Sequence, residues 1–265
     1  MAAIRPPAVA GTFYPADAAR LRETVEGHLA AAGGARGGRK PKALIAPHAG
    51  YVYSGPVAGH AFAALREHAP QIRRVVVIGP SHFVRFGGVA LPAAGVFRTP
   101  LGEVALDSAA LGAIRDLPPV TVAAAPHEPE HAVEVELPFL QVVLGDFALV
   151  PLVVGEAAPD AVAQVLDRLW GGPETLLVIS SDLSHYEPHA RAQQHDAATA
   201  LAIERLDAAA LGPADACGWL PLAGLLLQAE RRALQARRLD LRNSGDTAGP
   251  KDQVVGYGAW AFGEA

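Results

Sequence analysis

Histidine follows three separate apolar segments of the chain within a few residues. Residues 43–46 are followed by His48, residues 75–78 by His82, and residues 176–179 by Asp182 and His185. If these segments are parallel strands, the polar side chains all leave the carboxyl edge of one sheet, where open α/β sheets bind their ligands. A lone histidine is more often a core or surface residue, but three at equivalent positions favour a shared site.

Metal binding is the chemistry that this set of side chains favours. Neutral imidazole is a good ligand for first-row divalent ions. A carboxylate beside two imidazoles gives the facial arrangement of non-haem Fe(II) centres, which leaves positions open for O₂ or substrate. A further histidine outside the ligand set would serve as an acid or base, because imidazole titrates near neutral pH.

A second polar cluster spans residues 127–134 and contains two histidines and three glutamates. His131 and Glu134 are three positions apart, so they share one face if a helix has already begun there. That spacing can bind a metal, and it also fits a solvated helix start. We expect these two side chains to be substrate contacts or supporting residues.

The elements that must position these side chains alternate between strand and helix patterns. Continuously apolar runs predict strands buried on both faces, at 43–46, 75–78, 149–154 and 176–179. Helical patterns lie at 17–32, 56–68, 108–115, 134–144, 159–170, 190–206 and 218–235, and a last strand is expected at 253–262. This order predicts an α/β fold, in which helices cover both faces of a mixed, largely parallel sheet. We expect one domain spanning residues 1–265.

Composition excludes several classes of protein. The chain has 265 residues, 51% hydrophobic and 18% charged, so it is neither disordered nor too small for a full core. Its net charge of −5, without a long basic run, argues against nucleic-acid binding. A single cysteine fits a reducing cytosol. The absence of a long apolar stretch or a signal pattern predicts no membrane partner and a cytoplasmic location.

Other motifs carry less weight. Ser180, Ser181 and Ser184 lie near His185 and permit a hydrolase hypothesis, but no GxSxG elbow is present. No GxGxxG or GxxxxGK[ST] motif occurs, which removes the main support for nucleotide binding. Cys217 precedes an apolar helix and is expected in the core. The aromatic residues Phe13 and Tyr53 flank polar motifs and are expected to line a pocket.

The order of these motifs resembles that of the Memo family, known in bacteria and archaea as AmmeMemoRadiSam system protein B. The matching stretches are AGTFYP at 10–15, APHAGYVYSG at 46–55, GPSH at 79–82, EH at 130–131 with LP at 137–138, SSDLSH at 180–185, and NSGDT at 243–247. Together they span nearly the whole chain, so the resemblance is specific.

The resemblance implies a fold similar to class III extradiol dioxygenases of the LigB type. By motif, His48 and His82 match the two metal-binding histidines, and His185 with Asp182 beside it matches the acid/base group. A cysteine that serves as a further ligand in the eukaryotic Memo protein falls on Thr247 here. Asp246 would then supply a hard ligand, or Asp182 would bind directly. Without a thiolate, Fe(II) is favoured, with Mn, Zn or Cu as alternatives.

Two hypotheses for function remain. In the first, a mononuclear metal centre makes the protein a dioxygenase-like oxidoreductase of unknown substrate, with Phe13, Tyr53, His131, Glu134 and Thr247 as substrate contacts. In the second, the same pocket captures a peptide or small molecule without turnover. The family resemblance implies a functional link to radical-SAM and AMMECR1-like proteins, and hence a role in a modification pathway.

Overall fold

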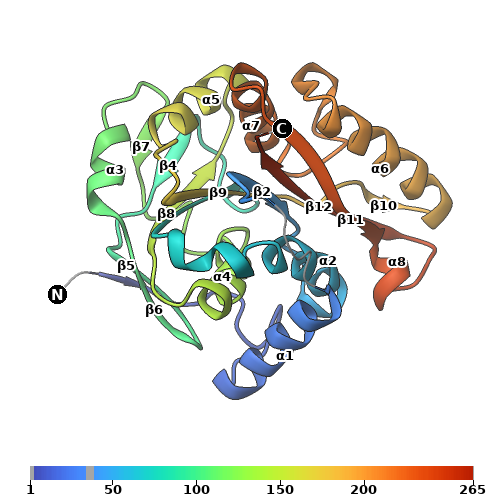
Figure 1. Cartoon of the computed structure of the whole chain (residues 1–265). Helices are drawn as coiled ribbons and strands as arrows, with labels where there is room; N and C mark the ends of the chain where they lie inside the picture. The colour runs from blue at the N-terminus through green and yellow to red at the C-terminus, as the bar shows by residue number, and fades with distance from the viewer. Residues whose placement is uncertain (1–2, 34–38, 265) are drawn as a thin grey trace.

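The computed structural model describes residues 3–33 and 39–264, and its main feature is a nine-stranded mixed sheet (Figure 1). The strands follow the order β10–β12–β2–β9–β3–β8–β4–β7, and β11 pairs with β12. Their bounds are β2 (Ala43–Ala46), β3 (Arg74–Pro80), β4 (Val89–Leu91), β7 (Val120–Val122), β8 (Ala148–Val154), β9 (Thr175–Ser180), β10 (His185–Glu187), β11 (Gln235–Asn243) and β12 (Val254–Gly263).

The centre of the sheet is the parallel set that the apolar runs predict. Strand β9 pairs in parallel with both β2 and β3, and β3 pairs in parallel with β8. Antiparallel strands flank this set, with β12 on β2 and β4 on β8. The residues that follow β2, β3 and β9 therefore leave the same edge of the sheet, as the sequence predicts.

Helices cover both faces of the sheet, which confirms the predicted fold class (Figure 1). One core joins the sheet to α1 (Ala18–Ala31), α2 (Tyr51–Ala63) and α4 (Leu137–Leu144). The other joins it to α3 (Ser108–Ile114), α5 (Pro159–Arg168), α6 (His189–Glu204) and α7 (Trp219–Arg231). Successive strand residues face opposite cores: Val75 and Val77 face the first, and Val76 and Ile78 the second.

A smaller sheet and several short helices complete the described chain. The three-stranded sheet has the order β1–β5–β6, with β1 (Ile4–Arg5), β5 (Val96–Thr99) and β6 (Gly102–Ala105). The short helices are η1 (Arg66–Gln71), η2 (Glu134–Glu136), η3 (Ala208–Ala210) and α8 (Ser244–Thr247). Among the described residues, no helix is long and apolar enough to cross a membrane.

The structure corrects two of the predicted helices. Helix α2 begins at Tyr51 rather than at Pro56, because the Ser54 amide donates to the Gly50 carbonyl and starts the helix earlier. The Tyr51 amide donates to the Phe13 carbonyl, which ties this helix start to the loop that carries Phe13. The helix expected at 134–144 divides into η2 and α4. Strand β11 is not among the predicted strands, because its sequence contains three arginines and no continuous apolar run.

Strand β1 holds the segment 127–134, which leads into η2, through the hydrogen bonds of Arg5. Arg5 is buried and donates to the carbonyl oxygens of His127 and Glu130 and to the Glu134 carboxylate. Glu134 is fully buried, and it also accepts from the Tyr14 hydroxyl and from the amides of Ala8 and Val9. A buried ion pair of this kind holds geometry, since either charge alone would be unpaired in the interior.

Helices α1 and α2 approach closely at Gly59. A Cβ at this position would lie 2.6 Å from the His28 carbonyl oxygen. We expect Gly59→Ala to lower the free energy of unfolding by about 1–3 kcal/mol, because the helices must separate. Gly27→Ala in α1 is the matched control, since its Cβ would meet nothing within 4 Å, and it should stabilise by about 0.5–1 kcal/mol. Urea unfolding measures both, and equal effects would contradict the account.

The ion pair between Arg5 and Glu134 gives a second prediction. Arg5→Met should lower the free energy of unfolding by about 3–5 kcal/mol, because it leaves the Glu134 charge buried without its partner. Adding Glu134→Gln to Arg5→Met should recover part of this loss, since the stranded charge is then removed. A double-mutant cycle in guanidinium measures the coupling. A loss below about 1 kcal/mol for Arg5→Met would show that the pair does not hold this segment.

Candidate metal centre

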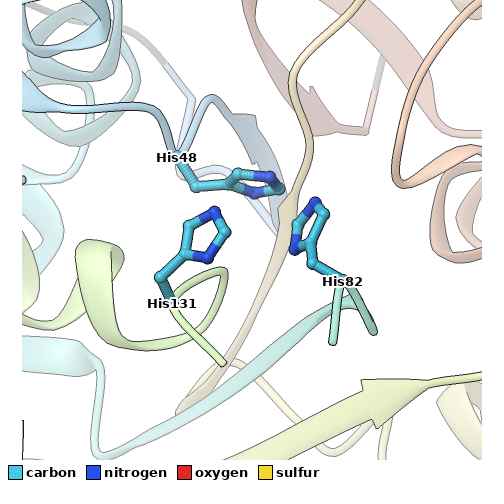
Figure 2. Close-up of side chains that lie close together, drawn as sticks. All are labelled: His48, His82 and His131. Carbon is cyan, nitrogen blue, oxygen red and sulfur yellow. The ribbon is translucent and has the colours of Figure 1, made fainter. Parts of the chain in front are cut away.

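Three histidine rings meet at the carboxyl edge of the parallel strands. His48 follows β2, His82 follows β3, and His131 lies in the segment before η2. Each offers one ring nitrogen, and these nitrogens all lie within 4.8 Å of one another. The ring centroids are 5.1 Å apart for His48 and His82, and 4.6 Å apart for His82 and His131. Figure 2 shows the three rings turned toward a common space.

The parallel register places His48 beside residues of β9. Ala46 pairs with Ser180, so the two strands end side by side. The His48 amide then donates to Asp182 Oδ1 at 2.8 Å, and its Nδ1 lies 2.7 Å from Ser180 Oγ. Its Nε2 lies 3.3 Å from Cys217 Sγ. His48 is 1% exposed, so its ring orientation is fixed by these contacts.

Glu130 orients His82. Its carboxylate accepts from the His82 amide at 2.7 Å and from the His82 ring at Nδ1 at 2.8 Å, and also from the amides of His131 and Ala132. Burial raises the pKa of the Glu130 carboxyl, but the hydrogen bonds and charge of His82 and the amide of Ala132 together lower it below its ordinary value. A carboxylate on Nδ1–H leaves Nε2 of His82 as the nitrogen with a free lone pair, as in many metal sites.

His131 approaches the other rings because strand β3 has a glycine, Gly79, one residue before its end. A Cβ on Gly79 would lie 2.8 Å from the Ala132 side chain, so glycine lets the His131 segment lie against the strand. His131 is 9% exposed, and its Nδ1 lies 3.4 Å from Glu130 Oε1. Because Nδ1 faces the Glu130 carboxylate, Nε2 is the nitrogen of His131 that is left for a metal ion.

The environment keeps two of these imidazoles neutral. Burial lowers the pKa of His48 well below its ordinary value, and the neighbouring histidine charges lower it further. Burial also lowers the pKa of His131 to about 4. At neutral pH, therefore, both rings carry a free lone pair, which is the state that binds a metal ion.

Three further groups surround the histidines. Asp182 is 5% exposed, and burial raises the pKa of its carboxyl to about 7. The Nδ1 of His185 lies 2.7 Å from the Leu183 carbonyl oxygen, which requires Nδ1–H and leaves Nε2 free. Burial lowers the pKa of His185. Burial raises the pKa of the Cys217 thiol to about 12, so it remains protonated at neutral pH.

The structure does not bring Asp246 or Thr247 to the three histidines. Asp246 lies in α8, where its carboxylate contacts His189 at 2.6 Å and accepts from the Asn243 amide. The Thr247 hydroxyl donates to the Ser244 carbonyl. Both residues lie in the turn before β12, and the third member of the group that could hold a metal ion is His131 rather than a carboxylate.

Glu134 is also placed differently from its expected role as a substrate contact. Both of its oxygens accept hydrogen bonds from the N-terminal segment, so it is a structural anchor. Phe13 does lie at the centre, with its ring 4.7 Å from that of His131. Tyr53, on the first turn of α2, is 39% exposed. Sequence reasoning missed the contacts of Glu130, Ser180 and Cys217, although the pair Glu130-His131 was visible as a motif.

Comparison with known proteins identifies the family. A family model described as "Memo-like protein" matches residues 5–261. A MEMO1 family protein of Sulfolobus acidocaldarius is 34% identical over 98% of this chain and 100% of its own length. One of Aeropyrum pernix is 38% identical over 97% of this chain and 98% of its own.

A solved structure supports the same fold. The uncharacterized protein JW3007 of Escherichia coli K12 aligns with a TM-score of 0.57 over 85% of this chain and 100% of its own, at 15% identity. At that identity the likeness concerns the fold alone. The family model and the relatives cover almost the whole sequence, and the chain belongs to the Memo family.

Proposed function

We propose that the protein binds a single divalent metal ion through His48, His82 and His131. The observation that carries this proposal is the convergence of three ring nitrogens within 4.8 Å. Nδ1 of His48 contacts Ser180, Nδ1 of His82 contacts Glu130, and Nδ1 of His131 lies 3.4 Å from the same Glu130 carboxylate. Three imidazoles suit iron, zinc and copper, and the resemblance to extradiol dioxygenases favours Fe(II).

We further propose that this centre makes the protein a dioxygenase-like oxidoreductase. A metal ion bound here would supply Lewis acidity and a place for a chelating substrate and an oxidant. His185 would move the proton, because its Nε2 is free and its ring is neutral at neutral pH. Asp182 would assist, since a carboxyl with a pKa of about 7 can both give and take a proton near neutral pH.

A non-catalytic binding protein is the alternative that one observation favours. Phe83 and Tyr186 are 60% and 71% exposed, and their rings lie 5.8 Å from those of His131 and His185, respectively. Exposed aromatic side chains near a site commonly anchor a peptide or a planar ligand. In that case the family resemblance points to a role in a radical-SAM-associated modification pathway.

The location we propose for the protein is cytoplasmic.

Metal titration tests the ligand set. The wild type should bind one Zn²⁺ or Fe(II) per chain, and His131→Ala should weaken binding at least ~100-fold, because a direct ligand is lost. His48→Ala and His82→Ala should behave alike. Asp246→Asn is the matched control and should bind within about threefold of wild type, since its carboxylate serves α8. Weakened binding in Asp246→Asn with intact binding in His131→Ala would reverse the assignment.

Oxygen uptake separates the enzyme from the binding protein. With Fe(II), O₂ and a series of catechol-like compounds, the wild type should consume oxygen. His185→Gln should lower kcat by about 10²-fold or more, because the proton acceptor is lost, while the metal remains bound. Saturable binding of these compounds without oxygen uptake would favour the alternative. Equal kcat in His185→Gln would remove the role assigned to this histidine.

A further inference from the structure

Two glutamates stand behind the histidines of the candidate centre, and only Glu130 is surrounded by N–H donors. The other, Glu136, is fully buried in η2, and its Oε1 contacts Ser180 Oγ, which in turn contacts His48. We infer that Glu136 is a neutral carboxylic acid that, through Ser180, holds His48 in the tautomer with Nδ1 protonated and Nε2 free. Glu136 is therefore a positioning residue for the metal ligand His48.

Ser180 Oγ has three close neighbours but only one proton to share with them. Its Oγ lies 2.6 Å from the Ala132 carbonyl oxygen, 2.7 Å from Glu136 Oε1 and 2.7 Å from His48 Nδ1. A hydroxyl has one proton to donate and two lone pairs to accept with. The carbonyl oxygen of Ala132 can only accept, so the Ser180 hydroxyl must donate its one hydrogen bond to that oxygen. The two remaining neighbours must then both donate to Ser180.

The other proton arrangements leave oxygens in contact without a hydrogen between them. If Glu136 were a carboxylate and accepted from Ser180, the Ser180 proton would point at Glu136. Ser180 Oγ and the Ala132 carbonyl oxygen would then lie 2.6 Å apart with no hydrogen between them. If His48 Nδ1 accepted instead, that same contact would remain. Only Nδ1–H on His48 and O–H on Glu136 satisfy all three contacts at once.

The surroundings of Glu136 agree with a neutral acid. Its second oxygen, Oε2, is buried and has no hydrogen-bond partner within the described part of the chain. An ionised carboxylate with an unpaired buried oxygen is far more costly than a neutral acid with one unpaired carbonyl. Burial raises the pKa of Glu136 well above its ordinary value, and the nearby Asp182 charge raises it further, whereas the Ser180 hydrogen bond lowers it.

The contact with Cys217 agrees with the same tautomer. The protonated thiol lies 3.3 Å from His48 Nε2, and a free lone pair there can accept from it. His48 and His82 thus expose the same nitrogen, but their partners differ in charge. Glu130 is a carboxylate with four N–H donors, and Glu136 is a neutral donor.

A pair of substitutions at Glu136 tests whether a neutral donor is what the site requires. Glu136→Gln retains an N–H that can donate to Ser180, whereas Glu136→Met has similar length and cannot donate. We expect Zn²⁺ affinity within about threefold of wild type for Glu136→Gln, and at least ~10-fold weaker for Glu136→Met. Glu130→Gln is the comparison and should weaken binding at least ~10-fold, because there the charge matters. This readout rests on the proposed metal site.

The tautomer itself is measured without a metal, so it is independent of the proposed function. In ¹⁵N-labelled, metal-free protein, long-range imidazole spectra should show His48 with Nδ1 protonated and Nε2 bare, assigned by loss of the signal in His48→Gln. Glu136→Gln should show the same pattern. An Nε2-protonated ring in the wild type would overturn the inference, whether or not Zn²⁺ binds and whether or not Glu136→Met folds.

If Glu136→Gln weakens Zn²⁺ binding as much as Glu136→Met does, a carboxylate is needed and the inference is wrong. Wild-type affinity in a folded Glu136→Met would show that Glu136 has no positioning role. Loss of Zn²⁺ binding by the wild type itself would instead contradict the proposed function and leave the tautomer measurement to decide. Far-UV circular dichroism establishes whether each variant is folded.

Discussion

The parallel pairing of β2, β9 and β3 is the constraint on which the candidate centre depends. Parallel strands in register end together, so the short segments after them must share one edge of the sheet. His48 and Asp182 leave neighbouring strands and join through a 2.8 Å hydrogen bond. His82 leaves the next strand, and Gly79 gives the His131 segment room to lie against it. A shift in this register would separate the rings without altering any of them.

Burial and hydrogen bonding then determine what the edge can do chemically. Desolvation keeps His48 and His131 neutral, and a neutral imidazole is the form that donates a lone pair. The carboxylate of Glu130 and the hydroxyl of Ser180 fix which nitrogen is available on His82 and His48. The buried pair of Arg5 and Glu134 holds the segment that carries Glu130 and His131. The geometry of the candidate centre therefore depends on Arg5 in the N-terminal strand as well as on the residues that surround the histidines.

The sequence predicts those parts of the molecule that local patterns determine. Continuous apolar runs indicate the four central strands, because strands buried on both faces need apolar residues throughout. The positions of His48 and His82 at the sheet edge can be predicted as well, because each comes shortly after one of these strands. His131 as the third nitrogen could not be predicted in the same way, since it reaches the centre through an irregular segment held by long-range contacts. Asp246 was favoured because it is adjacent to Thr247, but its side chain completes the cap of α8. Cys217 was expected in the core because it precedes an apolar helix, and only the packing of α7 against β9 brings its thiol to His48.

The most direct test of the central claim is a crystal structure of protein loaded with Fe(II) or Zn²⁺, with the metal located by anomalous scattering. The account predicts one peak, about 2.0–2.2 Å from a ring nitrogen of each of His48, His82 and His131. A peak coordinated instead by Asp246 and His189, or no peak at the edge formed by β2, β3 and β9, would contradict it.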